Sequence, residues 1–165
     1  MVALHIVDVK AFMNSLLIQN VFDNFLLSEL EIATYNQFTI NGVLNRSWFD
    51  DEEKEQLNGR THSTWNEVKP IAFQLFKGKK VPSSFKIVLF LSPENTVKVI
   101  EKSGITIDSA AVSSLFLNIR YENGNLQLIT GVSMKLFTMD KTLEHEWDSN
   151  MKQFLKHYQI GYEEE

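Results

Sequence analysis

Hydrophobic and polar residues alternate along this chain with two different periods, one typical of strands and one typical of helices. The clearest strand pattern covers residues 114–131, where the alternation is interrupted once, at Asn123-Gly124. An Asn-Gly pair tolerates the positive φ angles of a type I′ turn, whose twist matches that of two antiparallel strands. The sequence therefore predicts a β-hairpin over 114–131.

The same alternation predicts several further strands. The run FKIVLFL is nearly continuous in apolar residues and is bounded by turn residues, which is typical of a central, buried strand. Asn41-Gly42 interrupts another candidate strand, as either a bulge or a second turn. The final glutamates predict a solvated tail. The predicted strands are 4–7, 25–34, 38–43, 85–91 and 134–139.

Capping residues and an i, i+3, i+4 spacing of apolar residues predict five helices. Thr64 and Glu67 match a capping box, and Pro70 must kink the helix that follows or mark the start of a second one. The last helix is amphipathic and begins near 140 or 142. The other predicted N-caps and helices are Asp8 for 9–19, Ser47 for 47–57, and Ser92 for a helix to about 102 that stops at Gly104.

These elements predict an α+β fold of antiparallel sheets and helices, with a C-terminal amphipathic helix over 141–160. The order strand, helix, strand, strand occurs in 4–44 and again in 88–132, which predicts two βαββ repeats. Two domain organisations fit this pattern. Residues 1–165 form one domain, or two intimately packed halves, 1–59 and 81–140, are joined by a helical segment over 60–80.

Composition narrows the chemistry. The chain has no cysteine, which excludes disulfides, thiol catalysis and cysteine-ligated zinc and fits a cytoplasmic location. It carries a net charge of −5, so binding to nucleic acid needs a local basic patch. Asp8 and Lys10 come before any apolar run of signal-peptide length develops, and no apolar span of membrane length follows, so no membrane association is expected.

Six lysines supply the candidate basic patch. If the loop and the helix that carry them lie close in space, they form a cationic face able to neutralise a few phosphates. The alternative is that they are only solubilising. The anion or nucleic-acid candidates are Lys77, Lys79, Lys80, Lys86, Lys98 and Lys102.

Catalytic motifs are missing from the sequence. There is no GxSxG elbow, no GxGxxG loop, no HExxH pair and no calcium loop, so no catalytic residue, metal or cofactor is predicted. The alternative is a small enzyme whose site is assembled from distant residues, His62, Glu67, Arg120 and His145. The leading hypothesis is a non-enzymatic binding or interaction module that self-associates through an edge strand, with nucleic acid as a candidate partner.

The segments FLLSELEIATYNQF, FKGKKVPSSFKIVLFLSPEN, LFLNIRYENGNLQLITG and TMDKTLEHEWD cover most of the chain and resemble a family of short, uncharacterised bacterial proteins catalogued as a domain of unknown function. That resemblance implies no activity or cofactor. The topology is also similar to the repeating half-domain of DNA sliding clamps, whose paired helices face DNA. In this chain, however, the first helix carries only Lys10 as a basic residue.

Overall fold

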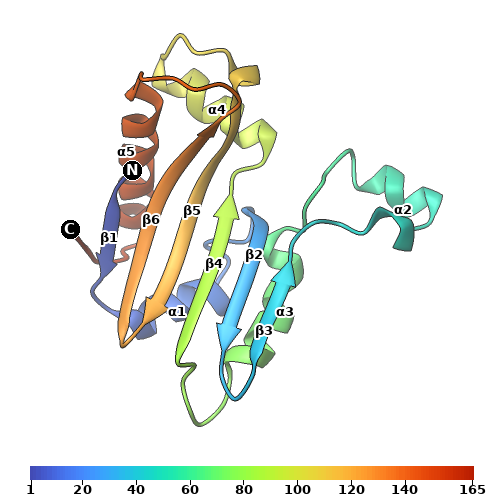
Figure 1. Cartoon of the computed structure of the whole chain (residues 1–165), viewed down its shortest axis with the longest axis vertical. Coiled ribbons are helices and arrows are strands. Elements are labelled where there is room, and N and C mark those ends of the chain that lie inside the picture. The colour runs from blue at the N-terminus through green and yellow to red at the C-terminus, as the bar shows by residue number, and fades with distance from the viewer.

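A seven-stranded antiparallel sheet organises the protein, as the computed structural model of residues 1–165 shows (Figure 1). The strands lie in the order β3-β2-β4-β5-β6-β1-β7. They are β1 (Ala3–Ile6), β2 (Leu26–Ala33), β3 (Gln37–Asn41), β4 (Ser84–Phe90), β5 (Val112–Glu122), β6 (Asn125–Met134) and β7 (Tyr162–Glu164). The helices are α1 (Val9–Leu17), α2 (Asp51–Gln56), α3 (Trp65–Phe76), α4 (Pro93–Ser103) and α5 (Thr142–His157). The α+β class and the C-terminal helix are confirmed.

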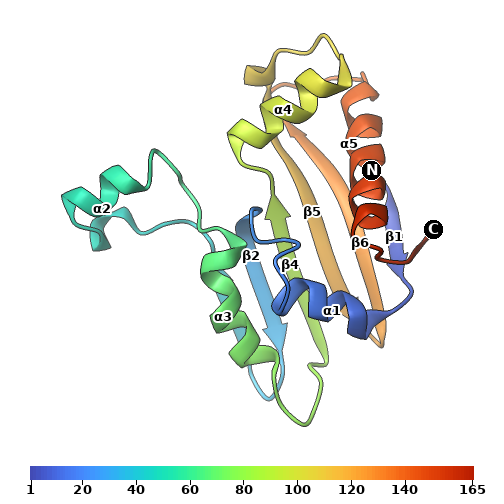
Figure 2. The same cartoon turned by 180° about the vertical axis from the view of Figure 1, so that it is seen from behind.

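The helices α1, α3, α4 and α5 all lie on one face of this sheet, and the other face has no helix over it (Figures 1 and 2). One core of 28 buried residues fills the space between the sheet and the helices. Two tryptophans anchor helices there through backbone carbonyls: the indole N–H of Trp65 donates to Leu16 O at 2.8 Å, and that of Trp147 donates to Phe116 O at 2.9 Å.

The predicted hairpin is confirmed as β5 and β6. Asn123 and Gly124 form its turn with φ angles of 53° and 78°, as a type I′ turn requires. The central position of the FKIVLFL strand is confirmed as well, because β4 pairs with both β2 and β5. It is buried on one face only, however. Phe85 and its alternate neighbours face the core, while Val88 and Phe90 remain half-buried on the uncovered face.

Most helix starts are confirmed, with one correction. Asp8, Thr64 and Ser92 cap α1, α3 and α4 as predicted, and α3 continues through Pro70 without interruption. The prediction for Ser47 was wrong, since α2 is capped by Asp50. The carboxylate of Asp50 accepts from the Glu53 backbone while the Glu53 side chain reaches back to the Asp50 N–H, a reciprocal arrangement that Ser47 does not make.

One strand prediction was wrong, and the acidic tail is more ordered than predicted. Residues 134–139 do not form a strand of their own, because β6 already runs to Met134 and a loop then leads to α5. The glutamates of the tail are exposed, as predicted, but β7 pairs with β1 and the carboxylate of Glu164 forms an ion pair with Lys152 of α5. A three-residue segment of such polarity becomes a strand only through its neighbour.

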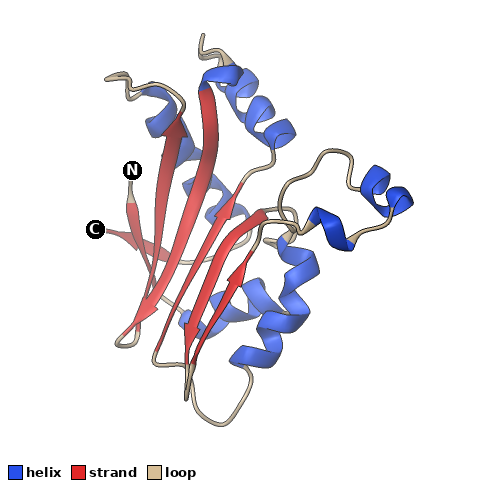
Figure 3. Ribbon diagram, turned by 45° about the vertical axis from the view of Figure 1, so that its right-hand side comes forward, coloured by secondary structure: helices blue, strands red, loops and turns tan.

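The order strand, helix, strand, strand does occur twice, as β1-α1-β2-β3 and β4-α4-β5-β6. The two units differ in the sheet, because β4 pairs with β5 of its own unit whereas β1 pairs with β6 and β7. A duplication and a clamp-like arrangement therefore stay predictions. Between β3 and α3 the chain makes an excursion that carries α2, lies off the β3 side of the sheet, and is called the arm here (residues 43–62; Figure 3).

Candidate binding face

The uncovered face of the sheet is a surface on which polar groups from all seven strands come together. Strand register places one row of polar side chains across all seven strands. In sheet order the row is Thr39, Glu31, Lys86, Arg120, Gln127, His5 and Glu163.

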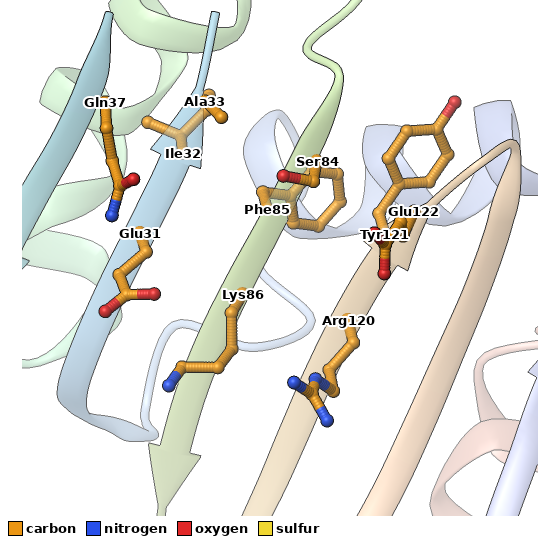
Figure 4. A pocket seen from close by; sticks show the side chains of 10 residues that line it. All are labelled: Glu31, Ile32, Ala33, Gln37, Ser84, Phe85, Lys86, Arg120, Tyr121 and Glu122. Atoms are coloured by element: carbon orange, nitrogen blue, oxygen red, sulfur yellow. The ribbon is translucent and has the colours of Figure 1, made fainter.

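Lys86 and Arg120 are the cations in the middle of this row. They are cross-strand neighbours on β4 and β5, and Figure 4 shows Lys86 between Glu31 and Arg120 at a hollow of about 210 Å³. Lys86 Nζ lies 3.5 Å from a carboxylate oxygen of Glu29, whereas Arg120 is exposed and forms no ion pair. A free guanidinium can bind a carboxylate or phosphate through two parallel hydrogen bonds.

An apolar hollow of about 410 Å³ lies on the same face, towards the end of β4 that leads to α4. Val88, Phe90 and Phe116 supply its apolar lining, and the ring of His62 from the arm stands edge-on to Phe90 at 4.9 Å between ring centroids. The Phe116 ring lies over Gly131, where an added Cβ would come within 2.2 Å of the ring. The absence of a side chain at Gly131 is therefore what lets the phenyl ring lie against β6.

His62 is the titratable group of this hollow. Its Nδ1 lies 2.7 Å from the Thr61 hydroxyl, and burial lowers the pKa of His62 below its ordinary value. The ring is therefore favoured in its neutral form, which suits an apolar surface. Three serines, Ser28, Ser114 and Ser133, complete the lining.

The central part of the face also holds a polar atom without a partner. Asn118 stands between Val88 and Ile129 in the row next to the cations, and its Oδ1 is buried and accepts no hydrogen bond. Such groups are uncommon in folded proteins and each calls for an explanation. Because this oxygen has almost no solvent-accessible surface, it is not among the groups that a partner on this face could contact.

The family of the chain could be assigned by comparison. A family model described as a family of unknown function (DUF5721) matches residues 15–163. The chain belongs to this family. No curated protein and no solved structure is significantly similar to it.

The six lysines of this DUF5721 chain do not form one patch. Lys77, Lys79 and Lys80 lie in the loop that precedes β4, and Lys98 and Lys102 lie on α4, which follows β4. Seven strand residues, or about 20 Å, separate the two groups. Lys86 lies between them, on the uncovered face, with Glu29 beside it.

The four residues of the alternative polar site are also kept apart. His62 and Arg120 line separate hollows on the uncovered face, whereas His145 is exposed on α5, on the opposite side of the sheet. Glu67 forms an ion pair with Arg60 and caps α3, and the hydrogen bond from Arg60 lowers the pKa of Glu67 although burial opposes the shift. The four residues therefore share no cavity.

Sequence reasoning about this DUF5721 chain missed the residues that shape the apolar hollow. The prediction of a buried strand over 85–91 placed Phe90 in the core, whereas Phe90, like Phe116 of β5, falls on the strand positions that alternate with the fully buried ones. The parity shared by Lys86, Val88 and Phe90 was the signal that could have identified them. The structure contains no group of three or more acidic or histidine residues that could hold a metal ion, and none of its helices is long and apolar enough to cross a membrane.

Proposed function

We propose that this chain is a non-enzymatic binding module and that a partner binds on its uncovered sheet face. The observation that carries the proposal is the combination, on one face without helices, of a half-buried aromatic hollow and an exposed, unpaired Arg120. Apolar surface beside a few polar groups that fix orientation is typical of binding sites. A cytoplasmic location, which the lack of cysteine fits, and self-association through an edge strand belong to the same proposal.

The partner that fits best is an extended acidic peptide segment with one large apolar side chain. Phe90 and Lys86 are four residues apart on β4, which corresponds to about 13 Å along the strand. An extended segment of about five residues spans this distance. Its apolar side chain would occupy the hollow at Phe90, and its carboxylate would pair with Arg120.

Catalysis has less support, because the face brings together no nucleophile and base. Nδ1 of His62 is hydrogen-bonded to the Thr61 hydroxyl, and no serine hydroxyl of the hollow forms a hydrogen bond to the His62 ring. Nucleic acid also has less to bind here, since the two cations alternate with Glu29, Glu31 and Glu122, which repel phosphate. A clamp-like role on DNA would need the lysines that the sheet keeps apart.

The proposal is tested with a library of acidic peptides, each eight to ten residues long by design with one aromatic or aliphatic anchor, screened by fluorescence polarisation. Peptides that bind the wild-type protein are expected to lose at least about tenfold in affinity to Arg120→Glu, because a desolvated charge pair becomes a repulsion. Lys156→Glu is the matched control, since Lys156 is exposed on α5 on the opposite side.

Binding that is equally strong to Arg120→Glu would show that the peptides bind elsewhere and would refute the assignment. A library without any binder would refute the peptide class. Single-stranded DNA is titrated in parallel at low salt. If the DNA binds, Arg120→Glu weakens that binding and no peptide binds, the partner of this face is nucleic acid and not a peptide.

A further inference from the structure

The outer edge of β3 has the features of a strand that pairs with another strand. Gly42 N donates to Ser28 O at 2.9 Å and Thr34 N donates to Asn36 O at 2.8 Å, so the even-numbered residues of β3 bond to β2. Backbone groups alternate in direction along an antiparallel pair. Gln37, Thr39 and Asn41 therefore direct their N–H and C=O groups away from the sheet.

Nothing in β3 protects this edge. Its sequence, QFTIN, contains no charge and no proline, which are the usual devices against strand pairing. The other edge of the sheet is different, because β7 is three residues long and carries Glu163 and Glu164. The free edge at β3 is thus the one available for pairing.

β3 is complementary to itself in one antiparallel register. With Thr39 opposite Thr39 of a second copy, Gln37 lies opposite Asn41 and Phe38 lies opposite Ile40. All three outward-directed residues of each strand then have backbone partners, the amide side chains pair with each other, and the aromatic ring meets a β-branched side chain. A two-fold dimer requires such self-complementarity of the same surface.

The two features that flank β3 carry opposite charges at opposite ends. The arm leaves the sheet directly after Asn41, and the lysine loop (residues 77–83) borders a hollow of about 660 Å³ beside Phe38 and the turn that precedes β3. Neither the acids of α2 nor the lysines of the loop form ion pairs. The groups are Asp50, Asp51, Glu52, Glu53 and Glu55 on the arm, and Lys77, Lys79 and Lys80 on the loop.

Antiparallel pairing brings these opposite charges together. The Asn41 end of one β3 comes to the Gln37 end of the other, so the arm of each copy leaves the sheet next to the lysine loop of its neighbour. Apolar groups meet in the same place, since Trp48 of the arm is 76% exposed and Tyr35 and Val81 of the hollow are 87% and 74% exposed.

We infer that two copies of the chain pair antiparallel through β3, and that the acidic arm of each copy binds the lysine loop of the other. The dimer explains the unprotected edge, the protruding arm and the lysine cluster with one interface. The dimer rests on the self-association included in the proposed function. It leaves the uncovered face of the sheet free, so that dimerisation and peptide binding fail or succeed separately.

A charge-exchange experiment tests the inference in the full-length protein. Glu52→Lys/Glu55→Lys and Lys79→Glu/Lys80→Glu each place like charges at both arm and loop contacts of a homodimer. Each is expected to weaken dimerisation at least about tenfold by analytical ultracentrifugation at low salt. A mixture of the two variants restores both contacts in the heterodimer, which is expected to form with near wild-type affinity.

Thr39→Pro tests the strand pairing separately, with Thr39→Val as the matched control. Proline removes the outward N–H that pairing needs, and an edge strand tolerates it where that N–H faces solvent. Circular dichroism is used to check that each variant is folded. A wild-type chain that is monomeric at high micromolar concentration, a folded Thr39→Pro variant that dimerises normally, or charge variants that do not prefer each other would overturn the inference.

Discussion

Gly42 lies at the junction between the sheet and the arm, and replacing it by alanine is expected to loosen that junction. An added Cβ would lie 1.8 Å from Leu27 O and 2.6 Å from Leu27 C, where ordinary contacts are 3.4–4 Å. The obstacle is backbone on β2, not the flexible end of a side chain. The strands must therefore separate to accept even a methyl group.

The hydrogen bonds at this junction set the size of the effect. Gly42 N donates to Ser28 O, Ser63 N to Gly42 O and Leu27 N to Ser63 O, at 2.8–2.9 Å. At about 1 kcal/mol for each bond, losing all three costs about 3 kcal/mol in the free energy of unfolding. For a chain of this length the melting temperature is expected to fall by roughly 6–12 °C.

Thermal unfolding followed by circular dichroism measures this difference. Gly161→Ala is the matched control, because an added Cβ there meets Val7 Cβ at an ordinary 3.7 Å. It is expected to change the unfolding free energy by less than about 0.5 kcal/mol. A Gly42→Ala protein that melts within the error of the control would refute the backbone-clash argument.

Three further changes are expected to have distinct effects. Trp65→Phe should cost about 2 kcal/mol in urea unfolding, since it leaves a buried carbonyl without its indole donor, whereas Trp48→Phe at an exposed site should cost almost nothing. Because Arg60 lowers the pKa of Glu67, that ion pair stabilises the fold above pH 4.5, and its contribution is lost as the pH falls below 4.5. The free energy of unfolding of Glu67→Gln should therefore depend less on pH in that range. Burial lowers the pKa of His62 in the folded protein, so the unfolded chain is protonated first as the pH falls below 6.5, and the folded state loses stability. The His62→Gln variant should lose less stability over the same pH range. Equal pH profiles for variant and wild type would contradict either statement.

Local signals made much of the fold predictable. The Asn123-Gly124 turn, the Thr64–Glu67 capping box and the Ser92 cap each depend on residues within a few positions of one another. At Ser47 the predicted cap was wrong, because the reciprocal hydrogen bonds between Asp50 and Glu53 set the start of α2 instead.

Such local signals could not predict how the strands pair in the sheet. The pairing of β1 with β6 and β7 depends on contacts across almost the whole chain, and β7 exists as a strand only because β1 lies beside it. The candidate site shows the same limit. Lys98 is close to Lys86 in sequence but lies on α4, beyond the end of β4. Arg120 is distant from Lys86 in sequence but is the direct cross-strand neighbour of Lys86.

The position of β1 has a consequence for synthesis of the protein. Ala3 pairs with Ile129 and Leu4 with Glu164, so β1 leaves the ribosome early and its partners leave it late. At typical translation rates the delay is roughly ten seconds. During that interval β1 has no partner strand. Once β6 has emerged, the outer edge of β6 stays unpaired until β1 docks. A nascent chain is therefore most prone to intermolecular strand pairing in this interval.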